Sequence, residues 1–230
     1  LKTSVKIEVK RLSGHVCWVC KSYDPWIADV VPLEDTQAPL WFQEGVFNFS
    51  LKSAANGIPL CPNCYRQFGL AEDPGLVIIP TDLQYFIDFE VENSKKRLLA
   101  ANEGKFLPRR VPTAAMYRDH LVKRGIISDE ATSGTYQSIF LKKHWFIDAF
   151  IPEKHGFTNP KHWHGAPLAT LRRGILTLGS GRIYSIDPTI VKNLTTLRDL
   201  YFEPTTAKES LSNLKRKKEQ ADDGEDESNE

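Results

Sequence analysis

The spacing of apolar and polar residues changes along the chain, and these changes predict a mixed α+β protein. Apolar and polar residues alternate in residues 4–10 (SVKIEVK), which is typical of a half-buried strand. Residues 26–32 (WIADVVP) contain a short β-branched run that ends at proline, and residues 76–79 (LVII) form another apolar run of strand length. We therefore expect strands in these three segments.

Helices are predicted after the turn and apolar run at residues 56–60 (NGIPL), and again near residue 81. The first is expected to begin within residues 65–70. Thr81 is the predicted N-cap of the second, with Gln84 completing a capping box. The β-rich run IDFEV leaves a strand as the alternative there, and the polar residues 92–108 are predicted to form a linker.

The second half of the chain is predicted to be mostly helical. Thr113 can cap one helix, and residues 165–178 place leucine and isoleucine side chains at helical spacing. Asp187-Pro188 suits the start of another helix, because the fixed φ and missing N–H of proline fit the first helical position. After Thr206 the chain is polar and charged, and it cannot bury enough apolar surface to fold.

These patterns divide the chain into three parts. We expect an α+β unit over residues 1–104, a helical extension over residues 105–205 that packs on it, and a disordered charged tail over residues 206–230. The basic run at residues 215–218 (KRKK) is typical of a solvated tail, with a nuclear localisation signal or a phosphate-contacting patch as alternatives.

Composition and charge fit a soluble globular protein. Of the 230 residues, 41% are hydrophobic and 26% are charged, which are ordinary values. The net charge of +1 creates no strong overall field, although the acidic tail leaves the rest of the chain mildly basic. No uncharged apolar run approaches the length that spans a bilayer, so we expect no membrane partner.

All four cysteines occur in two Cys-x-x-Cys pairs, Cys17/Cys20 in CWVC and Cys61/Cys64 in CPNC. Two turns that each present two thiolates suit tetrahedral zinc, which takes four sulfur ligands in structural sites. The alternative is two disulfides in a secreted chain. Because no cysteine is left over, the pattern favours a structural zinc ion and an intracellular location, in the nucleus or cytoplasm.

The two pairs are further apart in sequence than those of an ordinary four-cysteine zinc finger. The segments CWVC, ADVVPLED, NGIPLCPNCYRQF and PGLVIIPTDLQYFIDFE resemble the HNH endonuclease family, in particular the HNH-domain proteins abundant in fungi. The later segment HWHGAPLATLRR is similar to the C-terminal part of those proteins, so the resemblance covers most of residues 11–178. It implies a zinc-braced ββα-metal unit with a catalytic divalent ion, Mg²⁺ or Mn²⁺, and double-stranded DNA as the partner.

The resemblance also implies three site residues. In the family, a histidine at the end of the first strand is the general base, an asparagine before the second strand orients it, and a histidine on the following helix ligates the metal. These positions fall on Asp29, Asn56 and Tyr65. Asn56 keeps the family residue, whereas Asp29 and Tyr65 replace histidines.

Both replacements weaken the implied chemistry. A carboxylate with an ordinary pKa of about 3.9 is a poor proton acceptor at neutral pH, and a neutral phenol is a weak ligand for a hard divalent ion. We therefore expect a degenerate site of reduced or no activity in a protein that can still bind DNA. The alternative is an active, divalent-metal-dependent DNA endonuclease with a modified site that uses Asp29 and Asn56.

The remaining histidines and arginine pairs are expected to serve structure. His162 and His164 are predicted to cap or pack before the helix that starts near residue 165, and His120 to lie on a helical face. His15, beside the first cysteine pair, is predicted to be a surface residue or to support the metal site. Structural roles are also expected for His144 and His155. Arg109-Arg110 and Arg172-Arg173 could contact a DNA backbone, but dispersed pairs of this kind are typical of a solvated surface.

Overall fold

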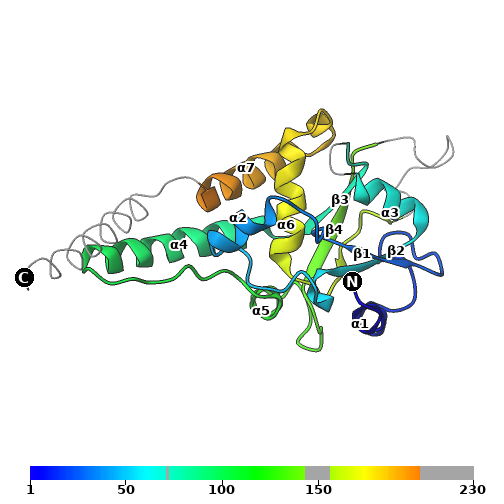
Figure 1. The fold of residues 1–230 in the computed structure, drawn as a ribbon, viewed down its shortest axis with the longest axis horizontal. Helices are drawn as coiled ribbons and strands as arrows, with labels where there is room; N and C mark the ends of the chain where they lie inside the picture. Colours follow the sequence, from blue (N-terminus) through cyan, green and yellow to red (C-terminus); the bar gives the residue numbers. More distant parts are fainter. Residues whose placement is uncertain (71–72, 143–155, 203–230) are drawn as a thin grey trace, which may run out of the picture.

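The computed structural model describes residues 1–70, 73–142 and 156–202, and these ranges form an α+β fold (Figure 1). Within them, β1 (Trp26–Asp29) pairs with β2 (Gly57–Leu60), and a separate antiparallel sheet has the order β3 (Leu76–Pro80), β4 (Thr135–Phe140), β5 (Lys161–His162). The helices are α1 (Thr3–Ser13), α2 (Ala38–Gln43), α3 (Pro62–Gly69), α4 (Leu83–Asn102), α5 (Ala114–Lys123), α6 (Pro167–Leu176) and α7 (Pro188–Phe202), with short 3₁₀ turns η1 (Ala54–Asn56), η2 (Thr177–Gly179) and η3 (Ile183–Ser185).

The strands β1 and β2 and the helix α3 form one local unit. The two strands are antiparallel, with Trp26 opposite Leu60 and Asp29 opposite Gly57. Helix α3 starts directly after β2, because Cys61 caps it and Pro62 occupies the first turn, where proline costs no hydrogen bond. The predicted strand within residues 26–32 is confirmed, and the helix expected to begin within residues 65–70 is present but begins earlier, at Pro62, inside the second cysteine pair.

The second sheet forms the centre of the molecule. Strand β3 is buried along its whole length, as expected for an apolar run covered on both faces, and it pairs with β4. Helix α6 packs on β3 and also contacts α7, and α7 lies beside α4 (Figure 1). The α6–β3 contact is close because Gly174 has no side chain: a Cβ there would lie 2.9 Å from Ile79.

Helix α4 extends further than its sequence predicts. Residues 92–102, expected to belong to a linker, continue the helix, and the alternative strand at IDFEV is wrong. The cause is a buried ion-pair cluster in which Glu90 contacts Arg97 at 2.8 Å and Arg109 at 3.0 Å. Polar residues therefore face the interior here, so the apolar pattern that marks a helix is absent. The helix is capped by Asp82, not by Thr81 as predicted.

Residues 4–10 form part of helix α1 instead of the predicted strand. The alternating pattern would bury Val5, Ile7 and Val9 together, but Ile7 is exposed and Val9 is buried. Val9 packs against β2 at Gly57, where an added Cβ would lie 2.5 Å from the valine side chain. Because Gly57 has no side chain, α1 can pack closely against β2 through Val9, and this contact favours a helix over a strand for residues 4–10.

The second half of the chain also contains strands, which the prediction of a mostly helical extension missed. Strand β4 pairs with β3 from the first half, and β5 extends the same sheet. The two caps predicted in this half are confirmed: Thr113 accepts a hydrogen bond from the N–H of Met116, and Asp187 accepts one from the N–H of Thr189. The predicted tail over residues 206–230, with the KRKK run, lies outside the described residues, as do His144 and His155. In the part that is described, no helix combines the length and apolar character needed to cross a membrane.

Candidate functional site

The four cysteines form one compact cluster, as the sequence predicts. Their Sγ atoms all lie within 4.8 Å of one another, with Cys20 3.6 Å from Cys61 and 3.8 Å from Cys64. Tetrahedral zinc with Zn–S bonds of about 2.3 Å separates its sulfur ligands by about 3.8 Å. All four are free thiols and none is joined in a disulfide, so this cluster could hold a zinc ion.

Backbone hydrogen bonds hold each cysteine pair in a tight turn. In the first pair, the N–H of Lys21 donates to the carbonyl of Cys17, and Lys21 adopts a positive φ of 66°. In the second pair, the sulfur of Cys61 accepts the N–H of Cys64 at 3.5 Å as the cap of α3. The cluster therefore connects the loop before β1 to the start of α3.

The four thiols are close enough to shift one another's pKa values: hydrogen bonds from Cys17 and Cys64 lower the pKa of Cys20. Hydrogen bonding with Cys20, together with burial, raises the pKa of the Cys17 thiol to about 11. Hydrogen bonds with Cys17 and Cys20, together with burial, also raise the pKa of Cys64. Four thiolates cannot share this space without a compensating charge, whereas a bound divalent ion deprotonates coordinating thiols.

A cleft of about 280 Å³ lies beside this unit, between the end of β1 and α3. Asp29 from β1 and Tyr65 from α3, two of the three residues implied by the HNH resemblance, both line it. Burial raises the pKa of Asp29, and the nearby carboxylate of Glu34 raises it further. Among the described residues that line the cleft there is no histidine.

Asn56, the third implied residue, is buried behind the cleft and organises its wall. Its Oδ1 accepts the N–H of Val31 at 2.8 Å, and its Nδ2 donates to the carbonyls of Val31 at 2.8 Å and Leu51 at 2.9 Å. The N–H of Val30 also donates to the Asn56 carbonyl. The asparagine therefore fixes the position of the chain immediately after Asp29.

Tyr65 sits on the outer side of α3. Its neighbour Cys64 faces the cysteine cluster, so the turn of the helix directs Tyr65 away from it, where the side chain is partly exposed. Its ring contacts Trp26 edge to face, with centroids 5.6 Å apart. Trp26 and Tyr65 thus link β1 to α3 at the molecular surface.

Three charged residues of the cleft, Lys6, Glu34 and Arg173, were missed by the sequence analysis. Glu34 follows β1 with no pattern to mark it, and Arg173 was expected at a solvated surface. The Arg173 side chain is instead buried; it donates to the carbonyls of Val30 and Phe68, each at 2.7 Å, and burial lowers its pKa to about 10. Arg172 is buried as well, paired with Asp35. An Arg-Arg pair on an amphipathic helix gives no sequence signal that it faces inward.

The segment 162–165 attaches the second half of the chain to the ββα unit. Trp163 donates its indole N–H to the carbonyl of Gly57 at 3.1 Å, and Trp18 of the first cysteine pair donates to the carbonyl of His162 at 2.8 Å. His164 Nε2 lies 3.0 Å from the carbonyl of Ala54 and its Nδ1 lies 2.9 Å from the Ser13 hydroxyl. The packing role predicted for His164 is confirmed, whereas His162 is exposed on β5, with its Nδ1 2.8 Å from the carbonyl of Ser133.

We expect stability to depend on pH through His164. A carbonyl can only accept, so Nε2 of His164 carries a proton, and burial lowers the pKa of the ring, which favours its neutral form. Below about pH 6.5 the imidazole of the unfolded chain binds a proton more readily than the imidazole of the folded protein, whose pKa is lower, so the free energy of unfolding decreases.

Urea unfolding at pH 7.5 and 5.5 should show this loss of stability in the native protein and a smaller loss in His164→Gln. His162→Gln serves as the control; an unchanged pH dependence in His164→Gln would contradict the assignment.

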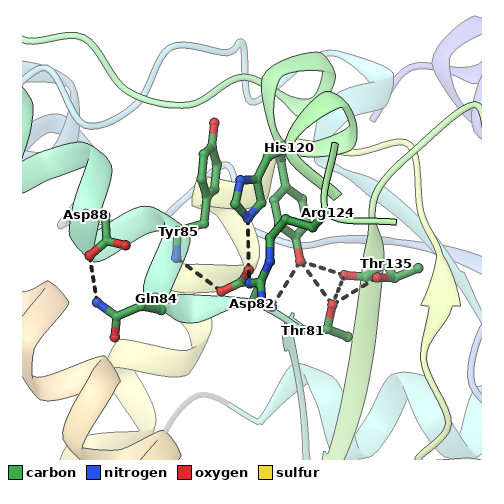
Figure 2. A network of polar contacts seen from close by, with 9 residues as sticks. Thr81, Asp82, Gln84, Tyr85, Asp88, His120, Arg124 and Thr135 are labelled. Carbon is green, nitrogen blue, oxygen red and sulfur yellow. Dashed lines mark hydrogen bonds and ion pairs between the residues drawn. The ribbon is translucent and has the colours of Figure 1, made fainter. Parts of the chain in front are cut away.

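A second polar network surrounds Asp82 at the start of α4 (Figure 2). Asp82 accepts hydrogen bonds from His120 at 2.9 Å, Arg124 at 2.7 Å and the backbone N–H of Tyr85 at 3.2 Å. Burial alone would raise the pKa of Asp82, but these three bonds lower it overall. The His120 ring also stacks on Tyr85, with centroids 4.2 Å apart. The network joins α4 to α5, which confirms a structural role for His120.

Comparison of the chain with protein-family models, curated proteins and solved structures found no match. The class of the protein is therefore defined by its own architecture. It is an α+β protein with a four-cysteine cluster that could bind zinc, set next to a cleft lined by Asp29 and Tyr65.

Proposed function

We propose that this protein is a zinc-stabilised, HNH-like nucleic-acid-binding protein whose nuclease site is degenerate. The observation that carries the proposal is the arrangement of Asp29, Asn56 and Tyr65. Asp29 ends β1, Asn56 precedes β2, and Tyr65 lies on the helix that begins at the cysteine cluster. This is the order of elements and residues that the HNH resemblance implies.

The chemistry of the cleft supports binding more than hydrolysis. No imidazole from the described residues is available there as a general base, and removing such a base typically reduces rates by about 10²- to 10⁴-fold. Among the described residues, only Asp29 and Glu34 offer carboxylate ligands to the cleft, and Tyr65 is a weak ligand for a hard cation. Lys6 and Arg173 line the same cleft and supply positive charge for a phosphate.

We expect the purified native protein to bind duplex DNA without cutting it. Fluorescence anisotropy with a labelled duplex should give a dissociation constant on the order of 10⁻⁴ to 10⁻⁶ M that weakens with salt, as for sequence-independent phosphate contacts. Lys6→Glu should weaken binding, whereas Lys105→Glu, an exposed lysine paired with Glu103 on the α4–α5 connection, should not. Absence of duplex binding at low salt would contradict the proposal.

Glu34 favours a second candidate, an active divalent-metal-dependent nuclease. Its carboxylate lines the same cleft as Asp29 and raises the pKa of Asp29, and two close carboxylates suit a magnesium ion. Plasmid cleavage by the native protein that requires Mg²⁺ and is lost in both Asp29→Asn and Glu34→Gln would establish this candidate.

A further inference from the structure

An exposed tryptophan lies where α1, β1 and α3 meet. Trp26 is 56% exposed, whereas the other tryptophans that the structure describes, Trp18, Trp41 and Trp163, are all buried. The edge-to-face contact with Tyr65 holds the indole in place on the surface. A large aromatic ring that is exposed and positioned in this way is available to a binding partner.

Two surface hollows share Trp26 and Tyr65 as a common wall. One, of about 500 Å³, continues toward α1, and the other, of about 580 Å³, continues along α3. Both volumes lie in the range typical of ligand sites, about 300 to 1,000 Å³. We call this region the Trp26 surface; its lining includes Lys6, Ile7, Lys10, Trp26, Tyr65 and Arg66.

The charge of the Trp26 surface has one sign. Lys6 and Lys10 line the first hollow and Arg66 lines the second, and no aspartate or glutamate among the described residues lines either one. Within the described ranges, these three side chains form no ion pair. Lys6 and Lys10 are one helical turn apart on α1, so both present their charge on the same side of Trp26.

We infer that the Trp26 surface binds single-stranded nucleic acid, with an unpaired base stacked on Trp26 and the flanking phosphates contacted by Lys6, Lys10 and Arg66. This inference rests on the nucleic-acid binding proposed above. An exposed aromatic ring beside unpaired cations is the combination that single-strand-binding proteins use, because every base has a face that can stack. In a duplex the bases already stack on each other and cannot reach the indole. The Trp26 surface adjoins the Asp29 cleft, since Lys6, Ile27 and Tyr65 line both.

The test compares a labelled twelve-nucleotide oligothymidine, a duplex of the same length and a poly-glutamate peptide, each titrated by anisotropy with the zinc-loaded native protein. The single strand should bind more tightly than the duplex. Trp26→Leu should weaken single-strand binding by about 10-fold, as expected for one lost stacking contact, with little effect on the duplex. Lys6→Gln combined with Lys10→Gln should reduce the salt slope for the single strand by about 0.7 for each charge removed.

Tyr184→Leu is the matched control, because Tyr184 is 92% exposed on η3 and lines neither hollow; it should change nothing. Single-strand binding that is unaffected by Trp26→Leu, while duplex binding persists, would overturn this inference and leave the proposed function intact. Binding of neither nucleic acid would overturn both. Poly-glutamate binding as tight as that of the oligonucleotide would instead identify a surface for acidic peptides and also overturn the inference.

Discussion

Replacing Cys61 by serine is expected to remove bound zinc and to abolish cooperative unfolding of the protein. The Cys61 sulfur belongs to the four-cysteine cluster and also caps α3, so it couples the first cysteine pair to the helix that carries Tyr65. Structural zinc contributes on the order of 10 to 16 kcal/mol in small metal-dependent domains, which is comparable to the entire stability of a typical domain, about 5 to 15 kcal/mol. Serine can still cap the helix but is a poor zinc ligand, so the loss should come from the metal.

Elemental analysis of the native protein should find one zinc per chain, and Cys61→Ser should contain almost none. Its circular dichroism should show a broad thermal transition in place of a sharp one. Ser22→Ala is a suitable control, because the Ser22 hydroxyl lies 3.2 Å from the Cys20 sulfur without belonging to the cluster, and this variant should keep its zinc. Two disulfides by mass spectrometry, or a metal-free native protein with normal stability, would contradict the zinc assignment.

The sequence predicts the parts of the fold that depend on local signals. The cysteine pairs and the caps at Thr113 and Asp187 each act through neighbouring atoms, and each appears in the structure as expected. Strand β3 can also be predicted from its own residues, because a strand that is buried on both faces is apolar at successive positions. These features need no knowledge of distant residues.

The missed features depend on contacts between distant segments. The apolar pattern of residues 4–10 does not distinguish a strand from a helix, and the helix depends on the packing of Val9 against Gly57. The end of α4 looks like a linker because buried residues there are polar, and Arg97 pairs with Glu90, which also contacts Arg109. Arg173 reaches the cleft from a helix more than a hundred positions away along the chain, so only the fold brings it beside Asp29.

We propose that β1, β2 and α3 keep an HNH-like geometry without the nuclease side chains, and we therefore expect that catalysis can be restored. Tyr65→His would supply an imidazole, which is a better metal ligand than a phenol, on the helix that borders the cleft. Asp29→His would supply a general base at the end of β1, a group typically worth about 10²- to 10⁴-fold in rate. Because each group needs the other, the double variant should gain far more than either single variant.

The most direct measurement is a plasmid-nicking time course with Mg²⁺ or Mn²⁺ on the native protein, Asp29→His, Tyr65→His and the double variant, all matched for zinc content. We expect slow or absent nicking by the native protein and both single variants, and nicking by the double variant that is faster by about 100-fold or more. A zinc-loaded double variant that cuts no faster than the native protein would contradict the claim. Robust native cleavage that is lost in Tyr65→Phe would contradict it as well, and would identify the Tyr65 hydroxyl as catalytic.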